Sequence, residues 1–376
     1  MMTLTDDQRL LQDTVRPLMA EEGAIKTQLR HWRDTGCTDG YGTALWKQFG
    51  ELGLTGMLIP ESHGGAGLGA VEAGVVLEEI GRNLTPSPFL TTAVAAVRAL
   101  EGSAQAVRWF PGILAGETVA ALAIDEGKHH HPAITGMEAR RQGNGFVLNG
   151  TKQFVVHGNS ADVILVAART GGAPGEVDGL TLFAVEKGAT GMDVDAATLA
   201  DSSKAARLNF DNVSVDADAV IGEADGGGAP LPRALNAGRA GPAAELVGVA
   251  AGASEMTYEY VKQPKQFGRL IGEFHVLQHR AAHLYGEIEI ARAAALKAAQ
   301  LLDAGDDQAE LFVSVAKAKA GRVSALAVQE GVQMHGGIGM TDEFDIGFFL
   351  KRARAAQQLF GDYRYHANRF AALNGY

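Results

Sequence analysis

A glycine-rich break between two helical stretches near the C-terminus constrains the fold more than any other feature of the chain. Its glycines are Gly336, Gly337 and Gly339. Apolar residues recur at helical spacing before the break and follow it among basic residues. Because glycine has no side chain, a ligand or second chain can approach this main chain, whose N–H groups can hold a diphosphate. A plain helix end and turn is the alternative explanation.

Length and charge narrow the class of protein. The 376 residues suffice for two or three domains with sizeable cores, and the net charge of −11 argues against nucleic acid or an anionic membrane surface as a partner. No run approaches the roughly 18 apolar residues of a membrane span. The single cysteine, Cys37, excludes an internal disulfide framework. The sequence therefore predicts a soluble, cytoplasmic protein.

The spacing of apolar residues divides the chain into three parts. The first and last parts show three- and four-residue spacing, typical of helices, and the middle part alternates with period two. The last part contains a regular seam from Leu277 to Leu302, as a helical bundle requires. We expect an α+β protein with three domains: an N-terminal helical domain at 1–116, an antiparallel β domain at 117–228 and a helical bundle at 229–376.

Two Asn-Gly pairs are the strongest turn signals within the β domain. Asn144-Gly145 and Asn149-Gly150 both predict hairpin turns. The glycine-rich segment 171–175 predicts a surface loop, and the segment 225–228 predicts a linker between domains.

Five stretches in this order resemble the acyl-CoA dehydrogenase family over nearly the whole chain. They are Leu52–Gly69, Leu148–Ala168 (LNGTKQFVVHGNSADVILVAA), Leu208–Glu223, Gln266–Glu273 (QFGRLIGE) and Val332–Arg354. The resemblance implies an N-terminal helical domain, a central β-barrel domain and a C-terminal four-helix bundle. Shorter details, such as Ala244-Glu245 and Phe360-Gly361-Asp362, look most like the small subunit of pimeloyl-CoA dehydrogenase and related actinobacterial-type dehydrogenases. Some of these work as hetero-oligomers.

The resemblance implies a flavoprotein that oxidises an acyl-CoA thioester to the trans-2-enoyl-CoA. A carboxylate would remove the α-proton, and FAD would accept the β-hydrogen as hydride. It also implies a homo- or hetero-tetramer that passes its electrons to an electron-transferring flavoprotein or a similar acceptor.

The resemblance assigns the glycine break to the FAD of a neighbouring subunit. Gln333, Gly336 and Gly337 match the family residues that reach its diphosphate and adenine. Phe267 matches a phenylalanine that packs near the adenine. Pro264 stands where the family usually has an arginine, so this part of the match is incomplete.

Two further departures lie in the β domain, beside the expected flavin ring. Asp125 replaces a threonine, and a carboxylate there would disfavour reduced, anionic flavin unless it is protonated or turned away. Phe154 can still stack on the ring, whereas Val156 has no hydroxyl with which to donate a hydrogen bond.

The catalytic carboxylate is missing from both usual family positions, which are Phe360 and Gly238 here. Glu245 lies seven residues after Gly238, two turns along the same helix face and among apolar residues. A carboxylate in such surroundings should hold a proton more readily than usual, as this base requires. A buried ion pair, with Arg239 or a bundle lysine, is the alternative role of Glu245.

Several questions of function stay open at this level. Small residues around Gly238 suggest a bulky, branched or ring-bearing acyl group, and Arg239 is a candidate substrate-binding residue for a distal carboxylate. The departures also favour a second hypothesis, a non-catalytic subunit that completes the FAD site of a paralogous chain. Flavin-dependent acyl-CoA oxidase chemistry is a related possibility. We expect no metal site, because His129-His130-His131 has no further ligand pattern and should be solvated.

Overall fold

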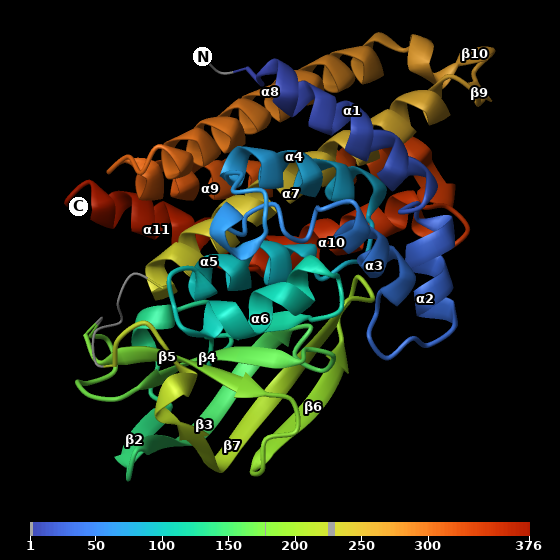
Figure 1. The fold of residues 1–376 in the computed structure, drawn as a ribbon. Coiled ribbons are helices and arrows are strands. Elements are labelled where there is room, and N and C mark those ends of the chain that lie inside the picture. The colour runs from blue at the N-terminus through green and yellow to red at the C-terminus, as the bar shows by residue number, and fades with distance from the viewer. Residues whose placement is uncertain (1–2, 177, 225–229) are drawn as a thin grey trace. The chain divides into compact units, whose positions relative to one another are not determined.

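The computed structural model describes residues 3–176, 178–224 and 230–376 (Figure 1). The predicted linker at 225–228 lies outside these residues, as does residue 229, the first of the predicted bundle. The chain combines helical N-terminal and C-terminal parts with a β-sheet in the middle, as expected for an α+β protein.

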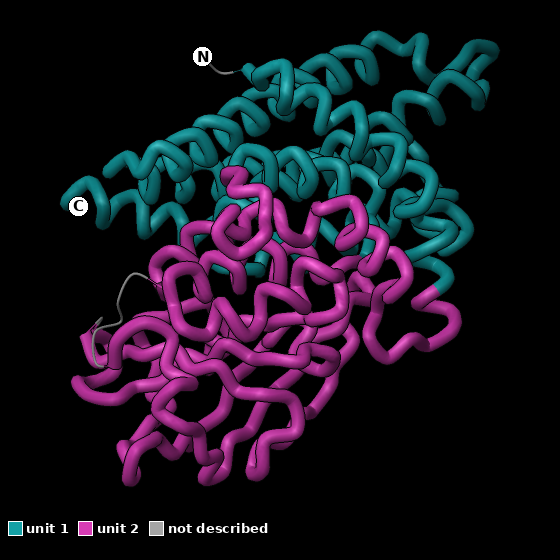
Figure 2. Tube along the Cα trace, in the orientation of Figure 1, with its two compact units in different colours: residues 1–31, 70–86, 239–376 teal, residues 32–69, 87–238 magenta. Residues whose placement is uncertain are grey.

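The chain divides into two compact units (Figure 2). Unit 1 contains residues 1–31, 70–86 and 239–376, and unit 2 contains residues 32–69 and 87–238. Helices of the predicted N-terminal domain therefore occur in both units. The boundaries of the three domains stay a prediction.

Unit 1 is helical, and most of its elements come from the C-terminal part of the chain. Helix α7 begins in unit 2 and continues into unit 1. The elements are α1 (Asp6–Glu21), η1 (Lys26–Arg30), α4 (Ala70–Asn83), α7 (Pro230–Val261), β9 (Lys265–Gln266), β10 (Arg269–Leu270), η6 (Ile271–Glu273), α8 (His275–Asp303), α9 (Ala309–His335), η7 (Gly336–Met340), α10 (Ile346–Gln358) and α11 (Tyr363–Leu373).

The predicted seam forms part of the core of unit 1. Leu284, Ile288, Ala291 and Ala298 of α8 are buried together with apolar residues of α7 and α9. Because many of these side chains are alanines, the helix axes can approach closely.

Helices α4 and α7 are in direct backbone contact. A Cβ atom added to Gly248 would lie 1.9 Å from the carbonyl oxygen of Glu78, and one added to Gly81 would lie 2.1 Å from that of Glu245. Neither oxygen can move without moving its helix. Glycine at these positions is therefore a condition for the crossing.

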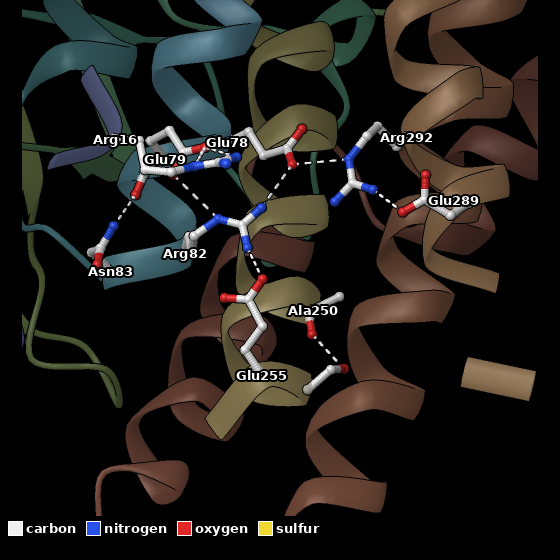
Figure 3. Close-up of polar contacts among 10 residues, drawn as sticks. Arg16, Glu78, Glu79, Arg82, Asn83, Ala250, Glu255, Glu289 and Arg292 are labelled. Atoms are coloured by element: carbon white, nitrogen blue, oxygen red, sulfur yellow. Dashed lines mark hydrogen bonds and ion pairs between the residues drawn. The ribbon is translucent and has the colours of Figure 1, made fainter. Parts of the chain in front are cut away.

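A network of charged residues surrounds the crossing and joins α1, α4, α7 and α8 (Figure 3). Its centre is Glu79, whose side chain is fully buried and accepts from Arg16 at 2.8 Å and pairs with Arg82 at 3.2 Å. Glu78 accepts from Arg292 at 2.9 Å. Buried carboxylates are costly unless they are paired in this way.

Unit 2 contains the β-sheet and the helices packed with it. Its helical elements are α3 (Thr43–Glu51), η2 (Glu61–His63), η3 (Phe89–Ala96), α5 (Val97–Leu100), α6 (Gln105–Leu114), η4 (Pro132–Ile134) and η5 (Ala217–Ala219), while α2 (His31–Asp34) starts at the last residue of unit 1's first segment. Its strands are β1 (Ala120–Ala123), β2 (Glu138–Gln142), β3 (Gly145–Val156), β4 (Val163–Arg169), β5 (Leu180–Glu186), β6 (Met192–Thr198), β7 (Lys204–Asp216) and β8 (Val220–Ile221).

The sheet has the order β6-β7-β3-β2-β4-β5-β8, with β1 beside β4. Its ladders are antiparallel as predicted, except that β1 and β2 both pair with β4 in parallel. The first predicted hairpin is present, but its turn is Gly143-Asn144, one residue earlier than predicted, since Gln142 pairs with Gly145. The second predicted hairpin is wrong, because Asn149-Gly150 lies inside the continuous strand β3 at a register shift. Gly150 there adopts a φ of 146°, so its role is a bulge and not a turn.

We expect Gly248→Ala to lower the free energy of unfolding by about 1–3 kcal/mol, because the added methyl group forces α4 and α7 apart. Gly286→Ala on α8 is the matched control. A Cβ at Gly286 meets no atom within 4 Å, so the free energy of unfolding of this variant should be about 0.5–1 kcal/mol higher than that of wild type. Urea unfolding measures both. Equal effects of the two substitutions would contradict the backbone contact.

Candidate functional site

The predicted glycine break is a main-chain corner at the end of α9. Gly336 ends the helix with φ 66° and ψ −141°. Cβ atoms added to Gly336 or Gly337 would meet nothing within 4 Å, and the Gln333 side chain one turn earlier is exposed. The corner therefore offers open backbone beside an amide side chain, as an approaching diphosphate would need.

His335 packs directly before this corner. Its ring stacks on Tyr260, with ring centroids 4.2 Å apart, and its Nδ1 lies 2.7 Å from the carbonyl of Gly331. Because a carbonyl only accepts, Nδ1 carries the hydrogen. Burial lowers the pKa of His335, against the opposing effect of the Gly331 hydrogen bond. A neutral, stacked imidazole supports the corner and does not resemble a general base.

Phe267 stands at the tip of the β9–β10 hairpin with 94% of its surface exposed. Its φ of 53° and the 82° of Gly268 form the turn. Helix α7 ends at Val261, three residues before Pro264, because proline cannot continue the helical hydrogen bonds. The ring is thus presented to solvent or to another molecule.

Glu245 lies on α7 at the crossing with α4 and is only 2% exposed. Arg352 of α10 donates to its Oε1 from Nε at 2.6 Å and lies 2.5 Å away through Nη2. The ion pair that the sequence suggested is therefore present, but its partner is Arg352. Arg239 instead donates to the hydroxyl of Tyr365 at 2.8 Å.

Arg239 is 2% exposed and lies against helix α11. Besides its hydrogen bond to Tyr365, its guanidinium lies 5.6 Å from the centre of that ring. Burial, together with the positive charge of Arg239, lowers the pKa of the nearby Arg369 to about 10. Two neighbouring cations are stabilised by an anion. Glu310 is such an anion, since it forms an ion pair with Arg369.

Lys317 of α9 is buried near Glu245, and its sequence pattern did not identify it as a site residue. Its Nζ donates to the carbonyls of Ala356 at 3.2 Å, Gln357 at 3.0 Å and Gly361 at 3.2 Å. Burial lowers the pKa of Lys317 to about 7, although Glu245 and Asp362 oppose that shift. No local sequence pattern marks this lysine as buried, so its role depends on the packing of the helices.

Two of the residues predicted to face the flavin, Phe154 and Val156, lie at the end of β3. Phe154 is 59% exposed and has a φ of 52°, at a bulge between Lys152 and Val155. A left-handed phenylalanine costs about 1–2 kcal/mol, and such strain is typical of functional positions. Val156, two residues later, is half-buried and has no side-chain donor.

Asp125 is turned toward the loop that follows it. Its Oδ2 lies 2.9 Å from Nδ1 of His130, and its Oδ1 accepts the backbone N–H of His131 at 3.0 Å. The expected solvation of the three histidines is therefore wrong for His130, whose side chain is 3% exposed. Within the described parts of the chain, no group of three potential ligands could hold a metal ion.

Lys152 fastens the same loop to β3 and was not identified from the sequence as a site residue. Its buried Nζ donates to the carbonyl of Ile124 at 2.9 Å and to Glu126 at 2.7 Å. Glu126 in turn accepts the backbone N–H groups of Gly136 and Met137. Burial lowers the pKa of Lys152, and the Glu126 carboxylate opposes the shift.

Comparison with known proteins places the chain in a family. Three family models match the chain. The model of the acyl-CoA dehydrogenase N-terminal domain matches residues 5–117, that of the middle domain residues 124–213 and that of the C-terminal domain residues 226–372. The chain belongs to the acyl-CoA dehydrogenase family. Its enzyme class is oxidoreductase acting on CH–CH bonds, and the family consists of FAD flavoproteins.

The relatives align over most of their length. Acyl-CoA dehydrogenase FadE12 of Mycobacterium tuberculosis is 32% identical over 83% of both chains. Cyclohex-1-ene-1-carbonyl-CoA dehydrogenase of Geobacter metallireducens is 31% identical over 94% of both chains.

Solved structures of the family share this fold. A variant of the steroid ACAD Tcur3481-Tcur3483 has a TM-score of 0.89 at 29% identity and covers 99% of this chain and 98% of its own. Butyryl-CoA dehydrogenase from Megasphaera elsdenii, at 24% identity, has a TM-score of 0.88 and covers 99% of both chains, which shows the fold alone. No helix in the described residues is both long and apolar enough to cross a membrane.

The residues present fit FAD in three respects. The open backbone at Gly336 and Gly337 suits a diphosphate, Phe154 presents an exposed ring, and the carboxylate of Asp125 is held by His130 and a backbone N–H. Val156, without a side-chain donor, and Pro264, in place of the family arginine, are departures for which the described residues show no substitute.

Lys317→Met should change how stability depends on pH. The folded-state pKa of Lys317 is about 7, below its ordinary 10.5, so between these values the unfolded chain binds more protons. Below pH 7 the buried Lys317 is charged and the burial of its ammonium group lowers the free energy of unfolding by the full amount. As the pH rises above 7, the folded protein loses this proton and the free energy of unfolding increases.

We therefore expect the free energy of unfolding of wild type, relative to Lys317→Met, to rise by up to about 1.4 kcal/mol per pH unit above pH 7. Urea unfolding of both proteins at about pH 6, 7, 8 and 9 measures this difference, and the variant serves as the control for every other titrating group. Parallel curves above pH 7 would mean that Lys317 keeps its ordinary pKa.

Proposed function

We propose that this chain is an FAD-dependent acyl-CoA dehydrogenase that forms a trans α,β double bond, with Glu245 as the base. The observation that supports this role is a buried carboxylate on α7, two turns beyond Gly238, one of the two positions where the family usually has its base. The other usual position holds Phe360, which cannot accept a proton.

The contact with Arg352 suits a base that must be ionised before reaction. Arg352 engages Oε1 of Glu245, which orients the carboxylate and leaves Oε2 to accept the α-proton. As the Cα–H bond breaks, its electrons form the C=C bond and the β-hydrogen leaves as hydride. Bound FAD would supply the hydride acceptor. Gln333, Gly336 and Gly337 are proposed to hold the FAD of a neighbouring subunit, together with Phe267.

The proposed substrate is the CoA thioester of a bulky, branched or ring-bearing acid. Relatives support this class by name, since they include dehydrogenases of cyclohex-1-ene-1-carbonyl-CoA and isovaleryl-CoA and a steroid ACAD. The small residues of α7 near Gly238 agree with it. Arg239, whose Nη2 donates to the hydroxyl of Tyr365, is the proposed partner of a distal carboxylate.

The proposed assembly is a homo- or hetero-tetramer in the cytoplasm, with an electron-transferring flavoprotein or similar acceptor. The exposed Phe267 at the hairpin tip supports association, because a ring that is 94% exposed gains by packing against another chain. A second candidate function is that of a non-catalytic subunit, like the small subunit of pimeloyl-CoA dehydrogenase, that completes a paralogue's FAD site. The departures at Val156, Pro264 and Phe360 favour this candidate.

Glu245→Gln tests the base directly. We expect at least a ~100-fold loss in the rate at which an acyl-CoA bleaches the flavin, because glutamine cannot accept the proton. Stopped-flow absorbance with straight-chain, branched and ring-bearing acyl-CoA thioesters measures this rate. The FAD content should stay the same.

Glu330→Gln is the matched control for that variant. Glu330 also pairs with an arginine of unit 1, Arg280 at 2.5 Å, and has no proposed role in the reaction. Its bleaching rate should match wild type. Full activity of Glu245→Gln would remove Glu245 from the mechanism.

The absorption spectrum of the chain expressed alone separates the two candidate functions. After incubation with excess FAD and removal of free cofactor, a self-sufficient flavoenzyme should retain about one flavin per chain, with bands near ~370 and ~450 nm. A colourless protein that binds flavin only when mixed with a paralogous chain would support the partner-subunit function instead.

A further inference from the structure

The turn between α10 and α11 is held by two buried, titratable side chains that come from different helices. Lys317 of α9 donates to the carbonyl of Gly361 at 3.2 Å, and Nε2 of His366, on α11, lies 3.1 Å from the carbonyl of Phe360. Both side chains are almost completely buried, at 2% and 0% exposure. Two successive carbonyls of one turn are thus each fixed from the core.

Lys317 also caps the C-terminal end of helix α10. The carbonyls of Ala356 and Gln357 belong to the last turn of that helix, where no intrahelical N–H is left to reach them. An ammonium group has three donors, and here all three meet carbonyl oxygens. Lys317 therefore ties the turn to the last residues of α10, beside the backbone hydrogen bond from Gly361 to Gln358.

His366 fixes the other end of the same turn. Because the Phe360 carbonyl can only accept, Nε2 of His366 carries the hydrogen. Asp362 caps α11 by accepting the backbone N–H of Tyr365 at 2.9 Å. The short turn is consequently bound to α9, α10 and α11.

The residue that these contacts hold is in an unfavourable conformation. Phe360 has a φ of 55°, in the left-handed region that a phenylalanine rarely adopts, and Gly361 follows at 104°. Such strain persists only where the surroundings impose it, and it is concentrated at functional positions. Phe360 also stands at the family position that usually carries the base.

We propose that Lys317 and His366 are positioning residues that hold the Phe360–Gly361 turn so that Phe360 forms a fixed apolar wall of the acyl-binding site. This inference rests on the proposed function, in which Arg239 binds the substrate. Arg239 donates to the hydroxyl of Tyr365, and the ring of Tyr365 lies directly against Gly361. The wall orients the acyl chain for the base, and neither Lys317 nor His366 touches the substrate.

A double-mutant cycle with the FAD-loaded protein tests this role. Lys317→Met should lower kcat/KM roughly 10- to 100-fold, mainly through KM, because the wall is displaced. In the Phe360→Ala background the same substitution should change kcat/KM less than about 3-fold, since no wall is left to position. Fully multiplicative effects of Lys317→Met and Phe360→Ala would overturn the proposal.

His366 provides a second pair of variants should Lys317→Met fold poorly. His366→Gln keeps an N–H donor near the place of Nε2 and should retain kcat/KM within about 3-fold of wild type, whereas His366→Leu should lose as much as Lys317→Met. Equal kcat/KM values for the glutamine and leucine variants would contradict a positioning hydrogen bond.

Hydrogen exchange separates a failure of this inference from a failure of the proposed function. In the protein without substrate, Lys317→Met and His366→Leu should speed exchange at the amides of Gly361 and Asp362 at least about tenfold, and His366→Gln should not. Unchanged exchange in both disruptive variants would overturn the positioning role. If wild type fails to bleach with any acyl-CoA while the exchange changes occur, the proposed function fails and the hold on the turn is confirmed.

Discussion

The contact between α4 and α7 is the constraint on which the arrangement of unit 1 depends. With Gly81 and Gly248 at the crossing, each helix presses its backbone against a carbonyl oxygen of the other. This closeness buries carboxylates that would otherwise reach water, Glu79 on α4 and Glu245 on α7. Each is then paired with an arginine from another helix, because an unpaired buried carboxylate would cost several kcal/mol.

Three of the buried cations share a second, related arrangement. The ammonium groups of Lys152 and Lys317 donate hydrogen bonds to backbone carbonyls in loops and turns. The guanidinium of Arg169 likewise donates to the carbonyls of Thr135 and Asp178. A carbonyl at a helix end or in a loop has no regular partner, so a long cationic side chain can satisfy it from the core. The cations thereby fix loops in place, which is what residues at a reaction site require.

The sequence predicted what depends on local periodicity and left out what depends on distant partners. The seam of α8 and most of the longer strands followed from apolar spacing, because burial on one face imposes that spacing. The turn assigned to Asn149-Gly150 was wrong because the same glycine also suits a bulge, and only the neighbouring strand decides between them. The partner of Glu245 could not be predicted, since Arg352 lies 107 residues further along the chain.

The contacts of Asp125, which the family resemblance predicts to lie beside the flavin ring, show how a carboxylate there can be compensated locally. An aspartate beside an electron-accepting ring would oppose reduction of the ring if its charge were uncompensated. Here His130 and the N–H of His131 take up both carboxylate oxygens, while Lys152 ties the adjacent Glu126 to β3. His130, which belongs to the histidine run that we expected to be solvated, is thus the residue that contacts the Asp125 carboxylate. The contact could not be predicted from the sequence as long as Asp125 and His130 were interpreted separately.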